Sequence, residues 1–159
     1  MPVPTHEQIN AYALAPVQLA TALQGLNDTA MHYIPAPDEW SIHEIIVHLA
    51  DSEAIGFWRL RKTIAEPGST LALYDQPGWA TQLSYKTQDR DLALALFAAL
   101  RASTAALLRA LPTATWELSS IHPERGEMSL YDIFQLYLNH SNGHMQQIAQ
   151  ILQVLPANA

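Results

Sequence analysis

Two histidines lie four residues apart, at His140 and His144, in the segment NHSNGHMQQIAQIL. Imidazole titrates near neutral pH and is the commonest metal ligand in proteins. If the segment is helical, the two side chains lie about 40° apart around the helix and about 6 Å apart along it. They then share an apolar stripe with Ile133, Ile148 and Ile151. Two rings placed in this way can converge on one cation.

A metal ion needs at least one further ligand, and the segment SIHEIIVHLADSE contains a candidate. His48 lies at the edge of the apolar stripe of this segment, and it can complete a three-histidine site if this helix packs beside the later one. The alternative is a pair of core histidines whose nitrogens are hydrogen-bonded to backbone or carboxylate groups. Spacing alone does not decide, because seven histidines in one chain often produce such a pair by chance.

Four further residues are candidates to support the site. Glu44 and Asp51 lie on the same expected helix as the third histidine and could orient a ring through a hydrogen bond. Tyr137 shares the stripe of the histidine pair. Glu53 falls among apolar residues, where a carboxylate needs a partner. That partner could be an arginine, or Glu53 could serve near the metal, and the sequence leaves both alternatives open.

The remaining histidines are expected at the surface and not at the metal. They are His6, His32, His43 and His122, and His122 in the segment HPERG has the greatest functional interest among them. Three arginines are likewise expected to be solvated or ion-paired, namely Arg59, Arg61 and Arg125.

The composition restricts the chemistry of such a site. The chain has no cysteine, so any thiol that reacts here must come with the substrate. A formal net charge of -7, without a cluster of lysine and arginine, argues against nucleic acid as a partner. Only 14% of the residues are charged, and no long apolar run or secretory signal is visible. The sequence therefore predicts a soluble, cytoplasmic protein without a membrane partner.

The elements that must position these residues are helices, because apolar residues recur mostly at helical spacing. Capping boxes at Ser41–Glu44 and Ser129–Asp132 mark two helix starts. The single domain expected for residues 1–159 is all-α, a four-helix bundle large enough to fold on apolar burial alone. Its long helices are expected at about residues 5–29, 41–65, 89–111 and 129–154.

The connection of residues 66–88 between the second and third long helices is too long to be structureless in a compact domain. Its segment YDQPGWATQLSY predicts a short extra helix near Trp79. The rings of Tyr74, Trp79 and Tyr85 could line a pocket or simply cover the end of the bundle.

Four segments together resemble the DinB/YfiT-like superfamily of candidate metal-dependent enzymes. They are EWSIHEIIVHLADSE, LFAALRAS, HPERGEMSLYD and NHSNGHMQQI, and the resemblance covers nearly the whole chain in the same order. It implies a four-helix bundle in which His48, His140 and His144 bind one divalent ion, commonly nickel, zinc or iron. It also implies a homodimer, and activities that include S-transfer with bacillithiol or mycothiol.

Three neutral imidazoles would leave the ion its full charge and an open position, which is typical of a catalytic site. A thiol bound there would lose its proton and become a nucleophile, whereas bound hydroxide would serve hydrolysis. The first interpretation is therefore a metal-dependent transferase that joins a low-molecular-weight thiol to a small electrophilic molecule. The alternatives are a metal-dependent hydrolase and a stress-related metal-binding or ligand-binding protein without turnover.

Overall fold

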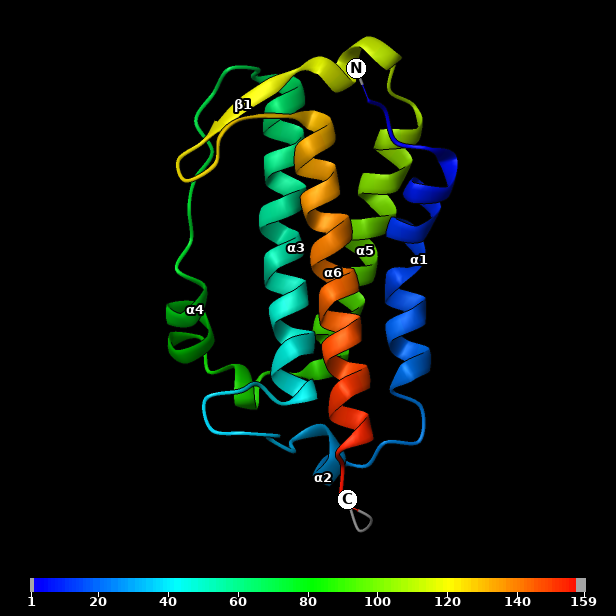
Figure 1. Cartoon of the computed structure of the whole chain (residues 1–159), viewed down its shortest axis with the longest axis vertical. Coiled ribbons are helices and arrows are strands. Elements are labelled where there is room, and N and C mark those ends of the chain that lie inside the picture. The colour runs from blue at the N-terminus through cyan, green and yellow to red at the C-terminus, as the bar shows by residue number, and fades with distance from the viewer. Residues whose placement is uncertain (1, 157–159) are drawn as a thin grey trace.

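The computed structural model describes residues 2–156 and forms a four-helix bundle (Figure 1). The long helices are α1 (His6–Ala22), α3 (Ile42–Ala65), α5 (Arg90–Arg109) and α6 (Leu130–Gln153). The short elements are α2 (Asp28–Met31), α4 (Gln76–Gln82), the 3-10 helices η1 (Tyr85–Thr87) and η2 (Thr113–Glu117), and the strands β1 (Ser119–His122) and β2 (Gly126–Ser129). The predicted bundle is confirmed, and so is the short helix near Trp79, which is α4.

Local signals explain where the long helices begin. The Ser41 hydroxyl accepts a hydrogen bond from the Glu44 amide, and the Glu44 carboxylate accepts one from the Ser41 amide. The same reciprocal pair at Ser129–Asp132 opens α6, so both predicted starts are confirmed. The sequence predicts that the first helix runs to about residue 29, and this is wrong. Helix α1 ends at Ala22, and the chain then turns at Gly25 with φ 80°.

A β-hairpin that the sequence did not predict lies between α5 and α6. Its strands are antiparallel, from Ser119 opposite Ser129 to His122 opposite Gly126. The loop after α3 joins this hairpin, because the Leu71 amide donates to the Ile121 carbonyl at 2.9 Å. The hairpin therefore lies over the C-terminal end of α3 and the N-terminal end of α6 (Figure 1).

The arrangement of the bundle makes α3 the neighbour of both α5 and α6, and α1 packs against α5 and α6. Helices α3 and α6 lie side by side in opposite directions (Figure 1), so residues on their facing sides meet. Among the described residues, α5 is long and apolar enough, by length and composition alone, to cross a membrane. A helix that packs into a bundle core meets the same criteria, and α5 carries the fully buried Arg101 into this core.

Candidate metal centre

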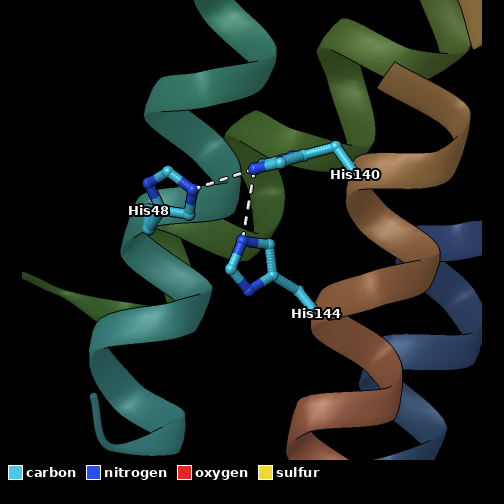
Figure 2. A group of neighbouring side chains, drawn as sticks. All are labelled: His48, His140 and His144. Atoms are coloured by element: carbon cyan, nitrogen blue, oxygen red, sulfur yellow. Dashed lines mark hydrogen bonds between the residues drawn. The ribbon is translucent and has the colours of Figure 1, made fainter. Parts of the chain in front are cut away.

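His48, His140 and His144 converge between α3 and α6, with their rings turned toward one another (Figure 2). Each ring offers one nitrogen, and the three nitrogens lie within 4.8 Å of one another. The Nε2 atom of His140 lies 3.1 Å from Nε2 of His48 and 3.2 Å from Nε2 of His144. Nitrogens about 2.1 Å from a tetrahedral ion lie about 3.4 Å apart, so small ring movements would admit an ion. The structure thus brings together the three histidines that the sequence singles out.

Burial keeps these rings neutral. His48 is fully buried, and the other two side chains are partly buried. Burial, followed by the neighbouring imidazoles, lowers the pKa of His48 to about 3. Burial, followed by His144 and Arg101, lowers the pKa of His140 to about 4, and burial also lowers the pKa of His144. Only the neutral ring binds a metal, so this donor set fits a divalent ion at neutral pH without a change of protonation.

Gln147 orients one of the rings. Nδ1 of His144 lies 2.9 Å from the side-chain oxygen of Gln147. An amide oxygen only accepts hydrogen bonds, so Nδ1 carries the proton and Nε2 keeps the lone pair that a metal needs. The sequence analysis missed Gln147, although its position three residues after His144 on one helix is a usable signal.

Trp40 is a second functional residue that the sequence analysis missed. Its ring centroid lies 4.7 Å from that of His48, and its ring stacks on His144 at 6.3 Å with an interplanar angle of 19°. Trp40 directly precedes Ser41, so the cap that starts α3 also places the indole against the site. An apolar ring here shields the imidazoles from water and contributes to the desolvation that keeps them neutral.

The residues expected to orient the histidines do not do so through hydrogen bonds. Within residues 2–156 none of Glu44, Asp51, Glu53 and Tyr137 has a hydrogen bond to the three rings. Glu44 caps α3, and this role holds its carboxylate at Ser41. Asp51 lies near Tyr85, where burial and then the Asp51 carboxylate raise the pKa of the phenol. The helix positions allow ring contacts, but the Glu44 and Glu53 carboxylates are hydrogen-bonded elsewhere.

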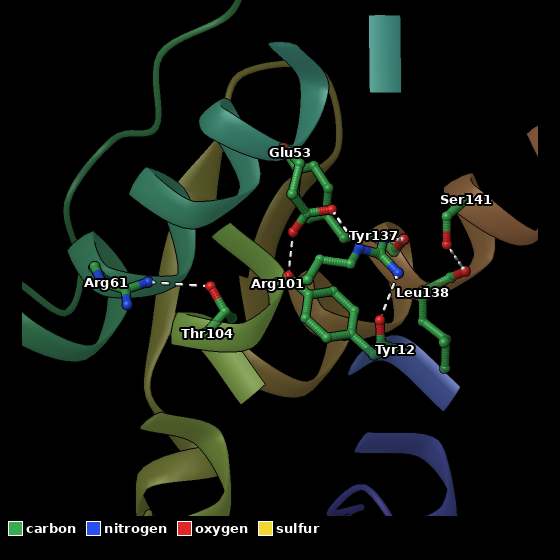
Figure 3. Close-up of polar contacts among 8 residues, drawn as sticks. All are labelled: Tyr12, Glu53, Arg61, Arg101, Thr104, Tyr137, Leu138 and Ser141. Atoms are coloured by element: carbon green, nitrogen blue, oxygen red, sulfur yellow. Dashed lines mark hydrogen bonds and ion pairs between the residues drawn. The ribbon is translucent and has the colours of Figure 1, made fainter. Parts of the chain in front are cut away.

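Glu53 belongs to a buried ion pair on another face of α3 (Figure 3). Its Oε2 accepts a hydrogen bond from Nε of Arg101 at 2.8 Å, and the two side chains are 2% and 1% exposed. The other Glu53 oxygen accepts from the Tyr12 hydroxyl. Arg101 also donates to the backbone carbonyls of Tyr12 and Tyr137. Of the two alternatives for Glu53, the pairing with an arginine is therefore confirmed.

Three residues expected at the surface or in ion pairs are buried, and these predictions are wrong. His43, His122 and Arg59 are 6%, 4% and 5% exposed. His43 stacks on the His32 ring, with the ring centroids 4.5 Å apart. Arg59 donates to the Ala72 carbonyl in the loop after α3, and His122 lies in strand β1 at the same cavity, so segments far apart in the chain meet here.

Comparison with known proteins agrees with the fold. The sequence profile described as the DinB superfamily matches residues 11–148. The chain belongs to the DinB superfamily. Two relatives, each named as a candidate metal-dependent hydrolase, come from Bacillus licheniformis and Geobacillus kaustophilus. The first is 33% identical over 135 residues, 84% of this chain and 77% of the relative. The second is 31% identical over 147 residues, 91% of this chain and 82% of the relative.

A solved structure supports the architecture. YfiT from Bacillus subtilis superposes with a TM-score of 0.88 at 24% identity, covering 96% of this chain and 90% of that chain. Its description gives it an unusual four-helix bundle topology. This likeness confirms the predicted DinB-like bundle for the present chain.

Proposed function

We propose that this DinB-superfamily protein is a metal-dependent enzyme whose single divalent ion is held by His48, His140 and His144. The observation that carries the proposal is the convergence of three neutral imidazole nitrogens from two helices. The relatives named as candidate metal-dependent hydrolases support the same class. Nickel, zinc or iron bound there would supply a Lewis acid with positions open to a thiol or to water.

Residues of the chain have three roles around that ion. The three imidazoles are uncharged, so they would leave the positive charge of the ion undiminished for substrate. Gln147 fixes the tautomer and orientation of His144. Trp40 excludes water from one side of the rings, which strengthens electrostatic interactions at the site.

We propose thiol S-transfer as the first reaction. In that reaction the sulfur of a low-molecular-weight thiol, such as bacillithiol or mycothiol, bonds to an electrophilic carbon, a halide leaves with the bonding electrons, and the thiol proton passes to solvent. The chain has no cysteine of its own, so the nucleophilic sulfur must be that of the substrate. Metal-dependent hydrolysis is the second candidate, and the names of the relatives are consistent with it. A metal-binding or ligand-binding protein without turnover is the third.

The test is consumption of a halogenated acceptor by zinc-loaded or nickel-loaded protein with bacillithiol, mycothiol or glutathione. Metal-dependent halide release that requires the thiol is expected. His144→Leu should abolish it, and His6→Leu, which removes an exposed histidine on α1, should not. Cleavage of esters or amides without any thiol would instead establish the hydrolase. Full metal occupancy without turnover of either substrate class would indicate the third candidate, a binding protein without catalytic activity.

We also propose that the protein forms a homodimer in the cytoplasm. Large apolar side chains are exposed on α1 and on α5, and a second copy of the chain could cover them. They are Leu14, Val17, Leu92 and Leu96. Sedimentation velocity should give a dimer for the wild type and a monomer for Leu92→Glu.

A further inference from the structure

Arg59 is a deeply buried guanidinium without a counter-ion. The side chain is 5% exposed, and it donates to the Tyr137 hydroxyl at 3.1 Å and to the Ala72 carbonyl at 2.7 Å. Its Nε is buried and has no hydrogen-bond partner among the described residues. None of the ion pairs within residues 2–156 includes Arg59.

This environment contrasts with that of Arg101, the other buried arginine. Arg101 has a carboxylate partner in Glu53 and two backbone carbonyls. A buried charge is costly unless an opposite charge and hydrogen bonds compensate it. Arg59 has two neutral acceptors and one unused buried donor, and no carboxylate among the described residues is paired with it.

A cavity of about 210 Å³ adjoins Arg59 and has room for such an anion. It is mainly polar, and the residues that matter for its charge are Arg59, His122, Glu124 and Arg125. Two guanidinium groups and one carboxylate leave one excess positive charge. Arg125 has no ion pair among the described residues either, so its charge is also available to a ligand.

His122 adds a neutral donor to this cavity. Its Nδ1 accepts a hydrogen bond from the Glu124 amide at 3.3 Å, so the ring proton lies on Nε2. Burial, followed by the positive charges of Arg59 and Arg125, lowers the pKa of His122. The ring is therefore uncharged at neutral pH, and the excess charge of the cavity stays at one.

Arg59 contacts α6 through the Tyr137 hydroxyl, as His48 does through His140. On α3, Arg59 follows His48 by about three turns, which places it about 20° from His48 around the helix and about 16 Å along it. On α6, Leu136 lines the cavity and precedes His140 by about 6 Å. A molecule that occupies both places would have to extend along α3 over this distance of about 16 Å.

We propose that this cavity, the Arg59 cavity, binds the carboxylate of the small molecule that reacts at the three-histidine site. A carboxylate matches the planar fork of a guanidinium, and a single negative charge matches the single excess positive charge. A phosphate dianion would leave a surplus negative charge in the cavity. That the bound molecule reacts at the metal rests on the proposed function, whereas carboxylate binding in the cavity does not.

The test is an NMR titration of the full-length, zinc-loaded protein with butyrate, followed through the arginine Nε–H and histidine ring signals. Butyrate should shift the Arg59 and His122 signals. Butyramide, which has the same shape without the charge, should not shift them, and inorganic phosphate should bind more weakly. The same shifts should persist in His144→Leu, because that variant removes a metal ligand and leaves the cavity intact.

Arg59→Gln should weaken butyrate binding by at least about tenfold, the usual loss for a hydrogen bond to a charged group. Arg61→Gln is the matched control, because this arginine donates to Thr104 and Ser103 on the α5 side (Figure 3) and should leave the affinity unchanged. Arg125→Gln changes an exposed residue and should weaken binding by about threefold. It keeps the test decisive if Arg59→Gln does not fold.

Several results would overturn the assignment. They are an unshifted Arg59 signal, equal binding of butyramide, tighter binding of phosphate, or an equal loss of affinity in Arg61→Gln. If the protein bound butyrate normally but bound no metal and had no catalytic activity, the proposed function would be refuted. Carboxylate binding in the Arg59 cavity would still hold.

Discussion

Lowering the pH from about 7 to about 5.5 should weaken zinc binding at the three histidines by less than about tenfold. Protons compete with a metal for imidazole only where the pKa of the ring lies near or above the pH. Burial lowers the pKa of His48 to about 3 and that of His140 to about 4, so both rings stay neutral over this interval. His144, whose pKa burial lowers as well, is the ring that can take up a proton.

The size of the effect follows from the ordinary histidine pKa of about 6.5. A ring with that pKa loses roughly eightfold of its neutral form between pH 7 and pH 5.5, and three such rings together lose several hundredfold. His144 alone sets the upper limit in this protein, which is roughly eightfold. The contrast between eightfold and several hundredfold is large enough to measure.

Competition with a zinc chelator whose own protonation is known would give the zinc dissociation constant at each pH. Circular dichroism at the same pH values would verify that the bundle is folded. A loss of several hundredfold would refute the reasoning, because it would mean that the metal-free rings titrate as solvated histidines do.

Four other outcomes are expected. Glu53→Leu should lower the free energy of unfolding by about 3–5 kcal/mol in urea titrations, because Arg101 would stay buried without its carboxylate. A large loss of zinc affinity in that variant would contradict the assignment of Glu53 to the ion pair alone. Gly56→Ala should destabilise the fold by about 1–3 kcal/mol, because a Cβ there would lie 2.6 Å from the Tyr137 ring, and an unchanged melting temperature would show that the ring has room to move. Removing the metal with a chelator should leave the helical circular dichroism intact at room temperature, since the apolar core does not include the metal, whereas unfolding would give the metal a structural role. The metal-free protein should lose stability as the pH falls from about 6.5 toward 4, because the unfolded chain takes up protons that the folded one does not. The loss should be about 1.4 kcal/mol per pH unit for each ring whose pKa is strongly lowered. Stability that is flat over this range would contradict the lowered pKa values.

The starts of α3 and α6 could be predicted from the sequence because their signals are local. A capping box at Ser41–Glu44 or Ser129–Asp132 involves residues three apart and needs no tertiary contact. The end of α1 was harder to place, since the apolar pattern continues past Ala22 and the turn depends on the conformation of Gly25.

The site divides in the same way. His140 and His144 share one helix, so their spacing predicts their convergence, whereas His48 joins them only through the packing of α3 on α6. Arg101 could not be matched with Glu53, because the two residues are 48 positions apart in the chain. Arg59 and His122 are buried where α3, the loop after it and the hairpin meet, and no local pattern encodes those contacts.

The most direct test of the three-histidine site is anomalous diffraction at the zinc absorption edge from crystals of the wild type and of His144→Leu, both grown with zinc. One peak is expected in the wild type, about 2.0–2.2 Å from the Nε2 atoms of His48, His140 and His144. No peak is expected there in His144→Leu, which should stay folded because Ile133 and Ile148 remain buried around it. A wild-type peak away from these rings, or full zinc occupancy in His144→Leu, would contradict the site.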